Sequence, residues 1–257
     1  MIKKTGILIE KIAATDYVKN IKQKLPLIIP LGAIEQHGAH LPLGTDTQIA
    51  NGLATELAKQ IPVIIAPSLQ YGCRSLPRSG AGDHFTGTTS LSGCAFTDAL
   101  SDILFSYIED GNRHLLLLNA HYENYQFASE AIHDVLYRCD AALRKKLKII
   151  YVAYWDLIPI KVIKEIFSDH FISWEVEHGG LLETSLMLAL HPTLVDMKKL
   201  KKQSPFYNLP YDVYPLSLSR SSKTGCLSSG ENATKEKGKA LIRTILSEIK
   251  KIIEAEF

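Results

Sequence analysis

The sequence predicts an α/β protein with a three-layer α/β/α fold, in which helices cover both faces of a mainly parallel central sheet. Apolar runs that do not alternate with polar residues, such as 25–31 and 114–119, are typical of strands buried on both faces. Segments with apolar residues at helical spacing separate these runs. Ionisable residues follow several of the runs, and open parallel sheets bind ligands beyond the carboxyl ends of their strands.

The expected elements alternate along the chain as this fold requires. Strands are expected at residues 25–31, 63–66, 114–119 and 148–154. Helices are expected near residues 7–20 after a short first element, and at 47–60, 90–110, 124–138, 181–191 and 233–254. Residues 70–89 form a long loop, after which Ser90 or Ser92 caps a helix that Gly111 ends. Residues 157–173 are irregular or helical, and residues 198–223 form a polar, extended segment.

The composition is that of an ordinary soluble protein. The 257 residues include 46% hydrophobic and 22% charged side chains, with a formal net charge of +2. This balance gives no reason to expect nucleic acid or a membrane surface as a partner. The cysteines are scattered without a C-x-x-C pair, and the N-terminal region lacks the pattern of a signal peptide. No apolar run reaches the roughly 18 residues of a membrane span. We expect a cytoplasmic protein with a single domain, residues 1–257.

The chemistry is expected to centre on the segment that follows the strand at 25–31. This apolar run breaks at Gly32, and Glu35, His37, His40 and Asp46 follow closely. Buried strands do not normally end in so many ionisable groups unless they bind something, and a divalent metal is the simplest ligand. His40 is either a further metal ligand or a structural hydrogen-bonding group.

Two pairs of residues share the same spacing and the same chemistry. Glu35 and His37 form one pair, His121 and Glu123 the other, and an extended chain turns both members of such a pair to one side. With Asp46 they provide about the number of ligands that two metals sharing a bridging carboxylate need, and zinc or manganese suits them. A single Glu-x-His after a strand is more often a capping or core group, so the hypothesis depends on both pairs.

A second polar cluster contains Trp174, Glu175, Glu177 and His178 and is followed by two glycines. Glu177 and His178 are either an acid/base pair, in which the carboxylate orients the imidazole, or the acidic start of a helix. Glu183, one turn into that helix, is either a surface group or a partner for a metal ligand.

Aromatic and hydroxyl groups near these segments can form a substrate pocket. Tyr122, Trp155 and Trp174 can stack against a flat substrate, or they belong to the core. Ser79 lies in the long loop, whose glycines lack the spacing and the lysine of nucleotide-binding loops. No G-x-S-x-G elbow occurs, so nucleophilic catalysis by a side chain is not expected.

These residues together resemble the creatininase family. The likeness runs nearly from end to end through GAIEQHGAHLPLGTD, NAHYEN, YWD and WEVEHGGLLETSLMLAL, and it is closest to the creatinine-hydrolysing members. The resemblance implies a zinc and manganese centre and a homohexamer. It implies that Glu35, His121 and Asp46 hold one metal, and that His37, Glu123 and Asp46 hold the other.

The resemblance also implies which residues contact a substrate. They are Ser79, Tyr122, Trp174, Glu175 and His178. One departure stands out, because Glu175 occupies a position where the creatinine-hydrolysing members have aspartate. The segment HLPLGTD likewise follows the general pattern of the family and not that of these members.

The expected function is hydrolysis of a cyclic amide, the lactam of creatinine, to creatine. Two divalent metals activate water, and Glu123 belongs to the catalytic centre. His178, oriented by Glu177, donates a proton to the leaving nitrogen. Trp174 covers the flat ring, Tyr122 and Glu175 orient its guanidine-like end, and Trp155 is a further substrate-binding residue. The alternatives are a family hydrolase that acts on a formamide or a peptide bond, and a metal-binding homologue without catalysis.

Overall fold

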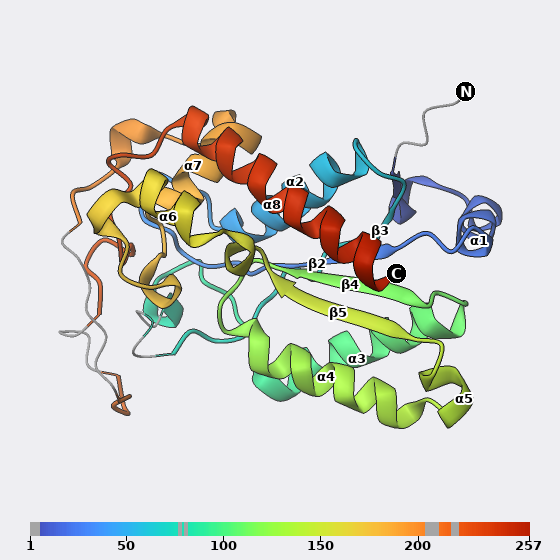
Figure 1. Ribbon diagram of the computed structural model, residues 1–257. Helices are drawn as coiled ribbons and strands as arrows, with labels where there is room; N and C mark the ends of the chain where they lie inside the picture. The colour runs from blue at the N-terminus through green and yellow to red at the C-terminus, as the bar shows by residue number, and fades with distance from the viewer. Residues whose placement is uncertain (1–5, 77–78, 80–81, 204–210, 217–220) are drawn as a thin grey trace.

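Figure 1 shows the computed structural model, which describes residues 6–76, 79, 82–203, 211–216 and 221–257. A five-stranded parallel sheet lies at its centre, with its strands in the order β1-β3-β2-β4-β5. The strands are β1 (Ile7–Leu8), β2 (Leu27–Leu31), β3 (Ile64–Ile65), β4 (His114–Asn119) and β5 (Lys148–Ala153). The sheet confirms the predicted α/β class.

Helices cover both faces of this sheet, so that the molecule has three layers (Figure 1). One layer contains α2 (Thr45–Ala58), α6 (Ile160–Phe167), α7 (Leu181–Leu190) and α8 (Lys235–Glu256), and the other contains α3 (Gly93–Glu109), α4 (Asn124–Arg138) and α5 (Ala141–Arg144). The short helix α1 (Ala14–Lys22) lies at one end of the sheet. Within β2, Ile28 packs into the core of the first layer, whereas Leu27 and Ile29 pack into the core of the second. Burial on both faces explains the continuous apolar runs.

Several boundaries follow signals that the sequence carries. The bounds of β4 and α4 match the expected ranges. Ser92 caps α3, because its hydroxyl accepts a hydrogen bond from the Ala95 N–H at 3.2 Å. Gly111 follows this helix with a φ of +110°, a backbone conformation that favours glycine.

Other elements differ from the expectation or refine it. Helix α2 begins at Thr45, because the Thr45 hydroxyl and N–H both bond to the Pro42 carbonyl, and Asp46 therefore lies in its first turn. The short first element is the strand β1, which pairs with β3. The stretch expected to be irregular or helical contains α6. Of the extended segment expected at 198–223, residues 204–210 and 217–220 lie outside the described residues.

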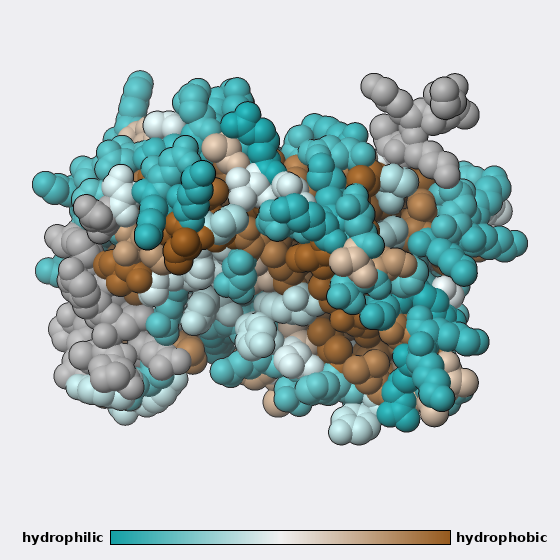
Figure 2. Space-filling model, viewed as in Figure 1, coloured by the Kyte–Doolittle hydropathy of each residue, from teal (hydrophilic) through white to brown (hydrophobic). Residues whose placement is uncertain are grey.

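The surface drawn in Figure 2 mixes polar and apolar side chains. Apolar atoms reach the surface in the middle of this view, near the sheet edge that β5 forms. Within the described part of the chain, no helix combines the length and the apolar character that crossing a membrane requires.

Candidate active site

The ionisable residues gather at the carboxyl edge of the sheet. Leu31 of β2 pairs with Asn119 of β4, so the segments that follow leave the sheet side by side. The Asn119 Nδ2 donates to the carbonyl of His121 at 2.6 Å, and the Asn124 Nδ2 donates to the carbonyl of Gly32 at 3.1 Å. These two buried asparagines lock the segments together. Sequence reasoning missed them, although they bracket the H-x-E pair in the motif NAHYEN.

Asp46 stands between two imidazoles. Its Oδ1 lies 2.8 Å from His37 Nε2, and its Oδ2 lies 3.2 Å from His121 Nδ1. The Oε2 atom of Glu35 lies 3.3 Å from the same His121 nitrogen. All four side chains are buried. The structure thus brings together Glu35, Asp46 and His121, the three residues expected to hold one metal.

Backbone carbonyls fix the orientation of both imidazoles. His37 Nδ1 lies 2.9 Å from the carbonyl oxygen of Glu35, and His121 Nε2 lies 2.8 Å from that of Cys73. A carbonyl only accepts, so these nitrogens carry the protons, and the other nitrogen of each ring faces carboxylates. An acceptor nitrogen facing a carboxylate needs a proton or a metal ion between them. Metal-binding histidines typically donate their second N–H in this way.

Glu183 extends from the first turn of α7 toward His37. Its Oε1 lies 3.6 Å from His37 Nε2, and its Oε2 accepts a hydrogen bond from the Gly179 N–H at 2.6 Å. His37, Asp46 and Glu183 therefore form a second group of three potential ligands. Because Glu183 is buried, it is not a surface group, and the structure favours its role as a partner of a ligand.

Glu123 belongs to neither of these groups. Its Oε1 accepts hydrogen bonds from the Ser79 hydroxyl and from the Leu76 N–H, the latter at 3.2 Å. Its Oε2 lies 3.5 Å from His121 Nε2. The structure places Glu123 beside the long loop, and among the described residues it is in none of the groups of three potential ligands whose atoms all lie within 4.8 Å of one another.

The long loop holds a second carboxylate through Ser75. The Ser75 hydroxyl donates to Glu35 Oε1, as the Ser79 hydroxyl does to Glu123. Gly82 approaches Glu35 so closely that a Cβ there would collide with the carboxylate. Sequence reasoning missed Ser75, and its only signal was its place in the same loop as Ser79.

The buried carboxylates give this site an excess of negative charge. Burial by itself lowers the pKa of His121, but the hydrogen bond with Asp46 and the charges of Glu35 and Glu123 raise it to about 10. Burial and the nearby charge of Glu35 raise the pKa of Glu123, against the opposing effect of His121. Four carboxylates, including Glu183, surround two imidazoles. Divalent cations would neutralise this charge, so the residues present fit a metal centre.

His178 faces the same site, but Glu177 does not orient it. His178 Nε2 lies 2.8 Å from the carbonyl oxygen of Gln36. The Glu177 carboxylate accepts hydrogen bonds from the Leu182 N–H and the Ser228 hydroxyl, both at 2.7 Å. The expected acid/base pair is therefore not formed, because Glu177 satisfies a free N–H at the start of α7, as the alternative reading of an acidic helix start requires.

Gln36 connects this site to a distant segment. Its Nε2 donates to the carbonyl of Gly225 at 2.6 Å, and its Oε1 accepts from the Gly38 N–H at 3.1 Å. The ring of His178 lies 4.2 Å from the ring of His37. His40, by contrast, has a structural role, since its Nε2 bonds with the Thr184 hydroxyl at 2.9 Å.

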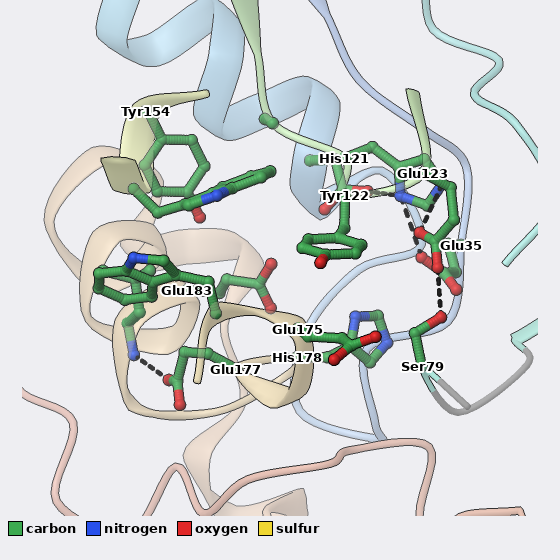
Figure 3. Close-up of a pocket in the computed structure, with 15 residues that line it drawn as sticks. Glu35, Ser79, His121, Tyr122, Glu123, Tyr154, Glu175, Glu177, His178 and Glu183 are labelled. Carbon is green, nitrogen blue, oxygen red and sulfur yellow. Dashed lines mark hydrogen bonds and ion pairs between the residues drawn. The ribbon is translucent and has the colours of Figure 1, made fainter. Parts of the chain in front are cut away.

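The carboxylates, His121 and His178 line a pocket of about 40 Å³ at the carboxyl edge of the sheet (Figure 3). Tyr122 and Trp155 form part of its wall, and their stacked rings have centroids 6.3 Å apart. Trp174 packs edge to face against Phe171, with ring centroids 4.5 Å apart. Of the site residues expected from the sequence, only His37 is not part of the lining. The others are Glu35, Asp46, Ser79, His121, Tyr122, Glu123, Trp155, Trp174, Glu175, Glu177 and His178.

Comparison with known proteins identifies the family. The family model described as creatininase, creatinine amidohydrolase, matches residues 10–253. This chain belongs to the creatininase family. The creatinine amidohydrolase of Pseudomonas putida is 38% identical over 232 residues, which cover 90% of this chain and 89% of that protein.

Solved creatininase structures share the whole fold. A manganese form superposes with a TM-score of 0.92 at 35% identity and covers 97% of this chain and 98% of its own. A mutant creatininase complexed with creatine also has a TM-score of 0.92, at 35% identity, and covers 96% of this chain and 97% of its own. Another mutant creatininase is a Zn–Zn form. It has a TM-score of 0.93 at 34% identity and covers 97% of this chain and 98% of its own.

The creatininase family includes other hydrolases. A mycofactocin precursor peptide peptidase of Mycobacterium tuberculosis is 34% identical over 119 residues, which cover 41% of this chain and 44% of that protein. The family therefore establishes a hydrolase of the metal-dependent amidohydrolase type, and the buried carboxylate and imidazole groups suit its metals.

Proposed function

We propose that this protein opens the lactam of creatinine to give creatine. The observation that carries the proposal is the position of Asp46, whose two carboxylate oxygens face two differently placed imidazoles. Such an acid can bridge two metals. The pocket beside it combines this centre with flat aromatic walls, as a small planar lactam requires.

The proposed metal ligands are those that the resemblance to creatininase implies. Glu35, His121 and Asp46 would hold one ion, and His37 and Asp46 would hold the other together with Glu123, with zinc and manganese as the pair. When bound, the two ions supply a water activated at neutral pH and polarise the amide carbonyl. Glu183 keeps His37 in place from the side of α7.

The remaining residues position the substrate and move protons. Trp155, Trp174 and Tyr122 enclose the flat ring, and Ser79 and Glu175 contact its polar edge. As water adds to the carbonyl carbon, Glu123 accepts its proton. His178 donates a proton to the ring nitrogen as the C–N bond breaks, and the Gln36 carbonyl, not Glu177, orients its imidazole.

Turnover of creatinine by the purified protein, with metal analysis of the same sample, tests this proposal. We expect creatine formation, about two ions per chain, and a loss of about a hundredfold or more in kcat for Glu123→Gln. Glu130→Gln, on the exposed face of the neighbouring helix α4, serves as the matched control and keeps full activity. Full activity of Glu123→Gln or of metal-stripped protein would contradict the proposal.

A second candidate is hydrolysis of another amide, such as a formamide or a peptide bond. It is favoured by Glu175, whose carboxylate reaches one methylene further than the aspartate of the creatinine-hydrolysing members. A panel of amides assayed with added manganese distinguishes the two candidates. Two bound ions without turnover of any amide would instead indicate a non-catalytic homologue.

The resemblance to creatininase also leads us to propose a homohexamer. Light scattering of the purified protein measures the mass directly. A mass of six chains supports the proposal, and a stable monomer contradicts it.

A further inference from the structure

A larger cavity adjoins the metal-binding pocket. Its volume is about 500 Å³, against about 40 Å³ for the pocket itself. The two cavities share Tyr122, Glu123, Trp155, Trp174 and Glu175 in their linings. We call this second cavity the outer chamber. A substrate whose amide lies at the carboxylates of the pocket can extend past these shared side chains into it.

The walls of the outer chamber are largely aromatic. Beyond the shared rings, Tyr125 and Phe127 of α4 and Tyr151 of β5 line it. Tyr125 and Tyr151 meet edge to face, with their ring centroids 5.3 Å apart and an interplanar angle of 72°. Aromatic faces attract flat groups, and their electron-rich surfaces attract cations in particular.

The charged residues of the outer chamber are mainly acidic. Among the described residues, its lining includes the carboxylates of Glu123, Asp156 and Glu175 and one cation, Arg74. Asp156 follows β5, and partial burial raises its pKa. Its carboxylate has no ion pair or hydrogen bond to another described residue. An aromatic chamber with a carboxylate at its wall that pairs with no described residue suits a flat cation better than an aliphatic group.

We propose that the outer chamber binds a flat cationic group of the amidinium or guanidinium type, carried by the substrate beyond its amide. This inference rests on the proposed amidohydrolase function for the amide itself. It names a substrate class larger than creatinine, namely lactams or amides with a planar cationic substituent.

Tryptophan fluorescence offers a direct test on the purified full-length protein. The chain has two tryptophans, and both Trp155 and Trp174 line the outer chamber. Benzamidinium is the cationic probe, and acetophenone is a neutral flat molecule of similar shape. We expect saturable quenching by benzamidinium, with a dissociation constant about tenfold lower than that for acetophenone.

Two variants and a matched control locate the binding. Asp156→Asn should reduce the preference for benzamidinium several-fold, and Tyr125→Ala should weaken the binding of both probes. Both side chains are exposed, so neither change threatens folding. Tyr137→Ala lies on the same helix as Tyr125, but outside the chamber, and should bind both probes as the unaltered protein does.

The outcomes separate this inference from the proposed function. Equal binding of the two probes, or unchanged binding by Asp156→Asn and Tyr125→Ala, would overturn the outer chamber as a cation site even if creatinine is hydrolysed. Selective binding without creatinine turnover would contradict only creatinine as the substrate. If a lactam is hydrolysed, a 4-amidinophenyl substituent should raise kcat/KM several-fold over a phenyl substituent, and a ratio near one counts against the inference.

Discussion

At the scale of single residues, the site depends on hydroxyl groups that hold carboxylates in place. Ser75 and Ser79 donate to Glu35 and Glu123 from one loop. Each bond fixes one carboxylate oxygen and leaves the other directed toward His121. These serines therefore pre-organise acids that would otherwise repel each other.

Replacing Ser75 by alanine tests this arrangement. We expect Ser75→Ala to weaken metal binding by about 10- to 100-fold, because residues that orient metal ligands typically contribute that much. Competition with a chromophoric chelator measures the affinity. Ser106→Ala is the matched control, since the exposed Ser106 hydroxyl bonds only within its own helix. An affinity unchanged in Ser75→Ala would show that the bond does not position Glu35.

At the scale of elements, the start of α7 serves the fold and the site together. Glu177 accepts hydrogen bonds at this helix end, His178 faces the metal site, and Glu183 reaches His37 from the first turn. A shift of α7 would therefore move three site residues at once. Helix α8 packs against α7 through Gly238, which contacts the backbone of Ser185.

The Glu177 carboxyl should make stability depend on pH. Burial raises its pKa to about 7, above the 4.5 of the unfolded chain. The folded state therefore retains this proton over a range where the unfolded state loses it. The contribution of Glu177 is fully present below pH 4.5 and is lost as the pH rises through about 7.

Glu177→Gln removes this dependence. Relative to the unaltered protein, the variant should gain stability on the order of 2–3 kcal/mol between pH 4.5 and 7. Urea unfolding of both proteins across this range measures the difference. A difference that does not change with pH would contradict a raised pKa at Glu177.

The contact between α7 and α8 requires a glycine at position 238. A Cβ there would collide with the backbone carbonyl of Ser185. Alanine usually stabilises a helix relative to glycine by about 1 kcal/mol, but here we expect Gly238→Ala to lower the free energy of unfolding by about 1–3 kcal/mol. Denaturant unfolding checks the sign. Lys239→Ala, at an exposed neighbouring position, should have little effect.

At the scale of the whole molecule, the buried acids link metal binding to stability. Without bound ions, the carboxylates of Glu35, Asp46, Glu123 and Glu183 lie close together inside the protein, and their negative charges repel one another. Ions present at 100 to 1,000 times their dissociation constant would stabilise the fold by about 3–4 kcal/mol per site.

Chelation should therefore lower the melting temperature, and added zinc or manganese should restore it. Differential scanning calorimetry with and without a chelator measures both changes. Asp46→Asn, which lacks the bridging charge, should respond far less. If the chelator does not change the melting temperature of the unaltered protein, this result would contradict a metal centre among these residues.

The sequence by itself determined the α/β class, most of the strands and helices, and the residues that meet at the carboxyl edge. These features follow from local patterns, since apolar runs define buried strands and parallel strands bring their carboxyl ends to one edge. The pairs Glu35/His37 and His121/Glu123 were visible because each is close in the chain.

Only the tertiary structure decided which groups meet. It placed Glu183 beside His37, turned Glu123 toward Ser79, and directed Glu177 to the start of α7 instead of to His178. Each of these contacts depends on how a loop or a helix packs onto a distant segment. Local spacing limits the directions of neighbouring side chains but does not fix distances across the fold. The sequence therefore predicted which residues belong to the site, and the packing determined which of them contact one another.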